Sequence, residues 1–234
     1  MLPNVDIVLP CYNPNERWVH ELLAFYKVAS ETYNLHFIVV NDGSQLQNPQ
    51  THISYLQQRQ IPLQYISYQN NQGKGHALRM GVKEASADLI LYTDIDFPFE
   101  NASMLGILNK LKSTNADVVA GYRNEMYYHN KMSLFRKVLS KSFRFFLKQI
   151  VRLPVSDTQC GLKAFNQNGK AVFLQTSINR YLFDFEFIYL CARKSNINLQ
   201  TELVALKQNV VFSKMPIKVL LQEVRNLLRV LLKR

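Results

Sequence analysis

The stretch Asp88-Leu89-Ile90-Leu91-Tyr92-Thr93-Asp94-Ile95-Asp96 sets an apolar run directly before a polar cluster that holds two aspartates. A short apolar run bounded by polar residues predicts a buried strand, here Asp88–Tyr92. Working outward, similar runs predict strands at Val5–Leu9, Phe37–Val40, Leu63–Ser67 and Val118–Ala120. Apolar residues at helical spacing between them predict helices at Glu16–Ser30, Thr51–Gln58, Gly75–Ala85 and Ser103–Leu111. This alternation is typical of an α/β fold with a doubly wound, mostly parallel sheet flanked by helices.

Polar clusters follow four of the predicted strands: Cys11–Asn15, Asn41–Ser44, Thr93–Asp96 and Gly121–Arg123. The strands of a parallel sheet end at the same edge, and ligands of open α/β sheets bind at that edge. We therefore expect the four clusters to meet in one binding site.

The composition is that of a globular protein, with 234 residues of which 47% are hydrophobic and 19% charged. This length predicts one domain, with the only plausible boundary near Ser213–Pro216. The three widely spaced cysteines, Cys11, Cys160 and Cys191, match neither a disulfide framework nor a zinc motif and favour a reducing compartment. The N-terminus does not resemble a secretory signal, and no apolar run approaches the roughly 18 residues of a membrane-spanning helix.

Two segments carry the net charge of +11. Residues 131–152 hold seven basic residues and no acidic one, and residues 214–234 hold six basic residues and the single acid Glu223. Both have apolar residues at helical spacing beside a basic stripe, the pattern of a helix that lies in a membrane interface. We expect a domain over 1–213 with an interface helix inserted at 131–152, and a C-terminal amphipathic helix at 214–234. Two core-packed helices with solvated basic faces are the alternative. The absence of zinc-finger, RNP-type and basic-zipper motifs argues against nucleic acid.

Asp94 and Asp96 stand one residue apart at a predicted strand end, where two carboxylates can share a divalent cation. Hard oxygen ligands suit Mg²⁺ or Mn²⁺, which in turn bind a diphosphate.

Two other polar clusters each allow a structural and a ligand-binding interpretation. Asn41–Ser44 is either a strand-ending turn or a place where Asp42 bonds the base or ribose of a nucleotide. Asn71–Gly75 is either a glycine-assisted turn or a helix N-terminus that holds an anion.

The order of these motifs resembles glycosyltransferase family 2 and, within it, the polyprenyl-phosphate hexosyltransferases such as the dolichyl-phosphate mannosyl- and glucosyltransferases. The first half of the resemblance lies in Val8–Asn13, Val40–Ser44, Asn71–Gly75 and Asp94–Asp96. The second half lies in Gly121–Arg123, Arg136 followed by Ser140, Asp157–Lys163, Phe183–Glu186 and Ser213-Lys214. Together these motifs cover roughly residues 4–230.

The resemblance implies a Rossmann-like GT-A fold, a UDP- or GDP-hexose donor, Mg²⁺ or Mn²⁺ as cofactor, and inversion at the anomeric carbon. At matching positions it implies that the donor is bound by Pro10, Tyr12, Val40, Asp42, Lys74, Thr93, Asp94 and Ile95, with the metal held by Asp94 and Asp96. The acceptor phosphate is expected at Arg123, Arg136, Ser140 and Lys214. Guanidinium groups suit this role because they grip phosphate bidentately.

The implied reaction moves the hexose to a polyprenyl phosphate at a membrane surface. This acceptor is already an anion, so a strong general base is not required. Asp157 and Glu186 are candidates for a base or an acceptor-orienting carboxylate, beside Asp96 at the metal. As alternatives, Asp157 caps a helix or turn, and Glu186 lies on the solvent side of an aromatic-rich helix.

Three departures from the family pattern stand out. Pro14 replaces a usual glutamate, and Pro98 replaces a frequent glutamine. The transmembrane helices that many relatives carry after the catalytic domain have no expected counterpart. Attachment to the cytoplasmic face of a membrane would then depend on the two amphipathic helices or on a partner membrane protein. A family 2 enzyme with a saccharide acceptor and a non-catalytic nucleotide-sugar-binding protein remain the alternatives.

Overall fold

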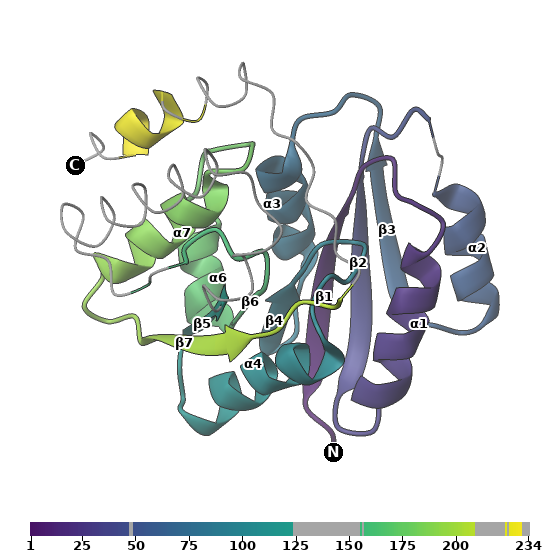
Figure 1. Ribbon diagram of the computed structural model, residues 1–234, viewed down its shortest axis with the longest axis horizontal. Helices are drawn as coiled ribbons and strands as arrows, with labels where there is room; N and C mark the ends of the chain where they lie inside the picture. The colour runs from purple at the N-terminus through teal and green to yellow at the C-terminus, as the bar shows by residue number, and fades with distance from the viewer. Residues whose placement is uncertain (47–48, 124–154, 156, 209–222, 224, 231–234) are drawn as a thin grey trace.

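The computed structural model describes residues 1–46, 49–123, 155, 157–208, 223 and 225–230, with a seven-stranded sheet between two layers of helices (Figure 1). The strands are β1 (Asn4–Cys11), β2 (Asn34–Asp42), β3 (Leu63–Tyr68), β4 (Leu89–Tyr92), β5 (Val118–Arg123), β6 (Lys163–Phe165) and β7 (Leu199–Val204). The helices are α1 (Trp18–Ala29), α2 (Gln50–Gln58), α3 (Lys74–Glu84), α4 (Asn101–Ser113), α6 (Gln167–Phe173) and α7 (Phe183–Ala192).

The strands lie in the order β3-β2-β1-β4-β6-β5-β7. Strand β1 pairs in parallel with β2 and β4, β2 pairs in parallel with β3, and β5 pairs in parallel with β7. Strand β6 is antiparallel to both of its neighbours, β4 and β5. The start of β6 therefore lies at the same edge of the sheet as the ends of β4 and β5. This short strand brings the loop before it to the edge where the polar clusters of the first half gather.

Each face of the sheet has its own hydrophobic core because side chains alternate along a strand. Ile7, Leu9 and Phe37 point to the face covered by α1, α2 and α4. Val8 and Ile38 point to the face covered by α3, α6 and α7. With helices on both faces, the strands are buried on both sides, which explains why they read as continuous apolar runs in the sequence.

The expected fold class is confirmed, and each strand and helix predicted before residue 121 is present. Strand β2 runs two residues beyond its predicted end, so Asn41 and Asp42 belong to the strand. Strands β6 and β7 and helix α6 were not predicted. Strand β6 has three residues, and β7 is only partly buried, so neither gives a clear apolar run.

The expected interface helix at 131–152, the boundary at Ser213–Pro216, and Arg136, Ser140 and Lys214 all lie outside the described residues. Near the C-terminus, residues 225–230 are helical. Val230 belongs to the same core cluster as residues of α3, α6 and α7, and Leu227 packs against it, while Arg225, Leu228 and Arg229 are exposed. Among the residues that the structure describes, no helix has the length and apolar character needed to cross a membrane.

Candidate functional site

Hydrogen bonds connect the loop after β1 with the loop after β2 at the carboxyl edge of the sheet. Asn13 has a positive φ of 45°, a region that Asn tolerates better than most residues. Its Oδ1 accepts hydrogen bonds from the backbone N–H groups of Gln45 and Leu46, both at 3.0 Å. Its own N–H donates to Ser44 Oγ at 2.9 Å. The neighbouring Tyr12 is 50% exposed, so its ring is open to a ligand at this edge.

Asp42 ends β2 as a buried carboxylate, only 3% exposed. Its Oδ1 accepts hydrogen bonds from Tyr68 Oη at 2.8 Å and Gln72 N at 2.7 Å. Its Oδ2 accepts from Asn71 Nδ2 and Gly73 N, both at 2.9 Å. A carboxylate offers about four lone-pair positions, so these donors fill it. A nucleotide that bonds this carboxylate, as the resemblance implied, must displace one of them. In this structure Asp42 holds the turn that leads into α3.

The glycines of that turn allow a second loop to approach closely. Gly73 has a φ of +105°, and a Cβ there would lie 2.5 Å from the carbonyl oxygen of Asn179. The N–H groups of Gly75 and His76 donate to this same oxygen at 2.7 and 3.3 Å. The N–H of Gly73 is bound to Asp42. Because the protein itself engages these amides, the structure favours a glycine-assisted turn over a helix terminus that holds an anion.

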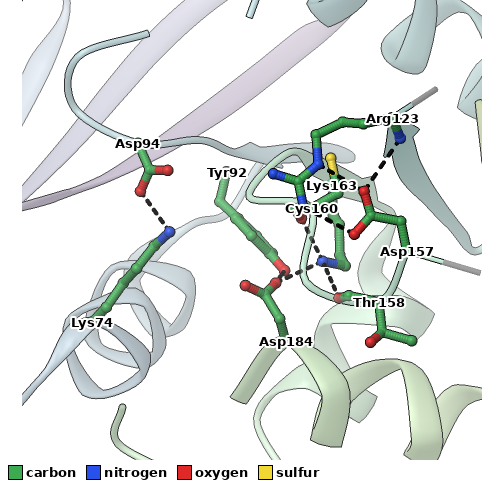
Figure 2. A network of polar contacts seen from close by, with 9 residues as sticks. All are labelled: Lys74, Tyr92, Asp94, Arg123, Asp157, Thr158, Cys160, Lys163 and Asp184. Atoms are coloured by element: carbon green, nitrogen blue, oxygen red, sulfur yellow. Dashed lines mark hydrogen bonds and ion pairs between the residues drawn. The ribbon is translucent and has the colours of Figure 1, made fainter. Parts of the chain in front are cut away.

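The two aspartates after β4 lie beside a lysine from the start of α3. Lys74 Nζ is 2.5 Å from Asp94 Oδ1, and the Asp94 side chain is 38% exposed (Figure 2). Burial alone would lower the pKa of Lys74, but the charges of Asp94, Asp184 and Asp96 raise it above its usual value. Gly161 lies directly against this pair, since a Cβ there would be 2.9 Å from Asp94 Oδ2 and 3.4 Å from Lys74 Nζ. The turn before α3, the end of β4 and the loop before β6 therefore meet at Asp94.

The donor atoms at Asp94 and Asp96 fit a divalent cation. Asp96 is exposed, but desolvation by the surrounding protein and the neighbouring charge of Asp94 raise its pKa. A bound cation would relieve the repulsion between the two carboxylates. Within the described part of the chain, no group of three or more His, Cys, Asp and Glu side chains is placed to hold a metal. Mg²⁺ usually keeps several waters and binds through one or two carboxylates plus substrate phosphates. The residues present therefore suit a cation shared with a diphosphate better than an all-protein site.

Arg123, at the end of β5, pairs bidentately with Asp157. Its Nε lies 2.7 Å from Oδ2 and its Nη2 lies 2.9 Å from Oδ1 (Figure 2). The backbone N–H of Arg123 adds a third hydrogen bond to Oδ2 at 3.2 Å. The structure thus brings together two residues predicted for the acceptor, and it pairs them with each other.

A buried lysine holds the loop that precedes β6 in place through hydrogen bonds. Lys163 is 0% exposed, and its Nζ donates to the carbonyl oxygens of Thr158 at 3.1 Å and Cys160 at 2.7 Å. It also donates to Asp184 Oδ1 at 2.6 Å, and the same oxygen accepts from Tyr92 Oη at 2.5 Å. Burial and the charge of Asp184 raise the pKa of Tyr92 well above its usual value, so its hydroxyl stays a donor.

The sequence motifs predicted no role for Lys163 or Asp184, although both residues lie within motifs that carry the family resemblance. The sequence does contain a signal that predicts a buried, paired charge at both positions. Lys163 stands within Leu162–Phe165, and Asp184 stands between two phenylalanines. A charged residue inside an apolar run is buried only if it is paired, so two such residues of opposite sign suggest partners.

Glu186 is also buried, at 1% exposure, and does not lie on a solvent side of α7. Its carboxylate accepts hydrogen bonds from Ser177 N at 2.8 Å, Ser177 Oγ at 2.9 Å and Ile178 N at 2.8 Å. It thereby holds the loop that packs against the turn before α3. A catalytic role for Glu186 stays a prediction, and it would require this carboxylate to leave at least one of these donors.

Three residues expected to line the donor pocket have buried side chains: Pro10, Val40 and Thr93. Val40 packs into the core beneath α3, and Thr93 is fully buried. They lie in or next to strands that helices cover on both faces, so only their backbone is placed to face a ligand at the edge. Tyr12 and the partly exposed Ile95 are more open there.

Comparisons with known proteins agree with the expected family. The profile of glycosyl transferase family 2 matches residues 6–172. The chain is 26% identical over 207 residues to the dolichyl-phosphate β-glucosyltransferase of Dictyostelium discoideum, covering 82% of this chain and 63% of that protein. It is 27% identical to the human dolichyl-phosphate β-glucosyltransferase, covering 80% of this chain and 62% of that protein. The chain thus spans less than two thirds of the length of these relatives.

Solved structures show the same fold at low sequence identity. Mannosyl-3-phosphoglycerate synthase from Rubrobacter xylanophilus has a TM-score of 0.67 at 14% identity, over 97% of this chain and 72% of that chain. Glucosyl-3-phosphoglycerate synthase from Mycobacterium tuberculosis was crystallised with Mn²⁺, UDP and glucosyl-3-phosphoglycerate. It has a TM-score of 0.60 at 16% identity, over 98% of this chain and 79% of that chain. A mannosyltransferase from Pyrobaculum calidifontis in complex with GDP-mannose and Mn²⁺ has a TM-score of 0.56 at 16% identity, over 87% of this chain and 56% of that chain. The expected GT-A fold is confirmed.

Proposed function

This chain belongs to glycosyl transferase family 2, and we propose that it moves a hexose from a UDP- or GDP-sugar to a polyprenyl phosphate. The names of the curated relatives favour glucose as the hexose and a polyprenyl phosphate as the acceptor. The UDP and GDP-mannose named with the neighbouring structures support a nucleotide-sugar donor.

The observation that carries the proposal is the pair of charged centres at one edge of the sheet. Lys74 and Asp94 form the first, and Arg123 and Asp157 form the second. A single short loop joins them. It begins with Asp157, which pairs with Arg123 (Figure 2), and it ends with Gly161, which packs against Asp94. A transfer between two phosphate-bearing substrates needs two such centres next to each other.

At the first centre, Asp94 and Asp96 would hold Mg²⁺ or Mn²⁺. The cation would neutralise the charge that develops on the leaving nucleoside diphosphate. Lys74 is a compact cation beside Asp94 and adds to this stabilisation. The exposed Tyr12 contacts the nucleoside, and Asp42 supports the pocket through the turn that it holds.

At the second centre, the acceptor phosphate binds Arg123. A phosphate oxygen attacks the anomeric carbon, and the bond from this carbon to the diphosphate oxygen breaks, leaving its electron pair on the diphosphate. The configuration inverts, and no proton has to be removed because the phosphate is already ionised. To grip the phosphate, Arg123 exchanges the Asp157 carboxylate for phosphate oxygens, and the freed Asp157 orients the acceptor. By resemblance, Arg136, Ser140 and Lys214 complete this phosphate site.

We place the reaction at the cytoplasmic face of a membrane. The basic segments 131–152 and 214–234 supply the attraction, since each basic residue near an anionic surface adds about 1 kcal/mol. Exposed Arg225, Leu228 and Arg229 support this placement, as do three buried cysteines that are all free thiols. A partner membrane protein would strengthen the attachment.

The test is transfer to lipid. The chain is incubated with Mn²⁺, labelled UDP-glucose or GDP-mannose, and anionic liposomes that contain a polyprenyl phosphate. After extraction with an organic solvent, the proposal predicts labelled sugar on the lipid, in the organic phase, with one of the two donors. Liposomes that contain the unphosphorylated polyprenol are the matched control and should give no product. Transfer to a saccharide acceptor alone, or donor binding without transfer, would contradict the proposal.

A further inference from the structure

We propose that Lys163 and Asp184 are positioning residues that set the loop Asp157–Gly161 between the two charged centres. This inference rests on the proposed function, because the loop matters for transfer only if those centres bind the donor and the acceptor. Neither side chain makes a hydrogen bond or ion pair to either centre in the contacts described above, and Asp184 acts on Lys74 only through its charge. Their effect on the geometry of the site would come through the loop.

The first support is the way in which Lys163 is buried. Lysine is almost never fully buried unless it is paired, and Lys163 is paired with Asp184, itself only 4% exposed. A buried ion pair is weak evidence for stability, since apolar residues of similar volume often serve as well or better. The pair therefore calls for an explanation other than stability.

The second support is what else the ammonium holds. Two of the three hydrogen bonds of Lys163 Nζ go to carbonyl oxygens of the loop, those of Thr158 and Cys160 (Figure 2). Among the described residues, the buried Thr158 hydroxyl has no hydrogen-bond partner, so it does not help to fix the loop there. Within the loop, the N–H of Cys160 reaches the carbonyl of Asp157 only at 3.4 Å. Arg123 holds the loop at its first residue, Asp157, and Lys163 is the main polar anchor of the rest of the loop among the contacts that the structure describes.

The third support is what the loop carries at its two ends. Asp157 precedes the anchored carbonyls and meets Arg123, while Gly161 follows them and packs on Asp94 and Lys74. On the other side, Asp184 fixes the ammonium to α7. Tyr92 Oη donates to the same Asp184 oxygen but does not contact the loop in the described contacts. Lys163 and Asp184 therefore set the spacing of the donor and acceptor centres. A misplacement of about 1 Å can lower a rate by about 100-fold.

The decisive variant is Lys163→Met, which keeps an unbranched side chain, one atom shorter, and removes its hydrogen-bond donors. We expect kcat for transfer to fall by about 100-fold, while the KM for the nucleotide sugar stays within about threefold, because the nucleoside pocket is built elsewhere. Lys170→Met is the matched control. Lys170 also donates to two carbonyl oxygens, those of Lys83 and Ala85, but away from the site, so kcat should stay within about twofold.

Tyr92→Phe separates positioning from stability. It removes one donor to Asp184 and leaves the loop contacts of Lys163 in place. We expect a lower melting temperature with kcat and the amide hydrogen exchange of residues 158–162 unchanged, whereas Lys163→Met should speed that exchange. A folded Lys163→Met protein with wild-type kcat and wild-type exchange would overturn the inference. So would a loss of kcat in Tyr92→Phe, even if Lys163→Met fails to fold. A wild-type chain that transfers no sugar would refute the proposed function instead, and the exchange measurement would still test the loop.

Discussion

Asp42, at the end of β2, and Asp94, just after β4, stand at the same edge of the sheet in opposite surroundings. Asp42 is 3% exposed and receives four hydrogen bonds from its own chain. The Asp94 side chain is 38% exposed and faces a lysine ammonium. The first carboxylate has no acceptor position left to offer, whereas the second keeps an open side. The difference supports our proposal that Asp42 holds the site together and that Asp94 binds the ligand.

The largest effect is expected for Asp94→Asn. Loss of a metal-binding charge at the leaving group should lower transfer activity by about 10²–10³-fold. Stability should change little, since a partly exposed ion pair contributes about 0–1 kcal/mol. Initial rates and urea unfolding of the same preparation measure both quantities. Wild-type turnover in this variant would refute the assignment of Asp94 to the metal.

Asp42→Asn should lower stability more than activity, the reverse of Asp94→Asn. The amide would turn its NH₂ group toward two of the four donors, and leaving buried donors unsatisfied costs about 1–3 kcal/mol. We expect a lower free energy of unfolding, with turnover by the folded fraction reduced less than in Asp94→Asn. If Asp42→Asn is as stable as the wild type and has lost nucleotide binding, the carboxylate binds the nucleotide directly and the comparison fails.

A smaller effect is expected for Gly161→Ala. The new Cβ would lie 2.9 Å from Asp94 Oδ2, and the flexible carboxylate can move away. We therefore expect Mn²⁺ affinity and turnover to fall by roughly tenfold, with an unchanged melting temperature. Gly106→Ala in α4 is the matched control, because a Cβ there meets no atom within 4 Å. Equal, unimpaired Mn²⁺ affinity in both variants would show that Gly161 does not shape the site.

The smallest effect concerns pH. Although Asp96 is exposed, desolvation by the surrounding protein and the charge of Asp94 raise its pKa above the usual value of 3.8. At a pH between the usual pKa and the raised one, the folded protein holds more protons than the unfolded chain. The free energy of unfolding should therefore fall as the pH rises through this window, and the effect should be small because the group is exposed. Asp96→Asn should remove this slope, which urea unfolding at several pH values would detect. An identical slope in both proteins would contradict the raised pKa.

Much of the fold could be predicted because the buried strands of a doubly wound sheet give strong local signals. Val5–Leu9 and Phe37–Val40 are examples, and the polar clusters after them mark the edge correctly. Strand β6 could not be found in this way. Its three residues include Lys163, and its burial depends on β4 and β5, which are distant in the sequence.

The candidate site was predicted in part. Sequence motifs identified Asp94, Lys74, Arg123 and Asp157, which the structure places at two neighbouring centres. They could not tell which carboxylate is already occupied, because the donors around Asp42 come from the turn before α3, and their approach is a property of the folded chain. The buried pair of Lys163 and Asp184 was missed for a similar reason, since its partners meet only when β6 and α7 pack together.

The most direct test of the account is a thermal-shift titration of the wild type and Asp94→Asn with Mn²⁺ and a panel of UDP- and GDP-sugars. A ligand at 100 times its Kd stabilises a protein by about 2.7 kcal/mol, which a melting curve resolves. The account predicts a shift of the wild type with one nucleotide sugar that requires Mn²⁺ and is lost in Asp94→Asn. An equal shift in both proteins, or none with any sugar of the panel, would contradict it.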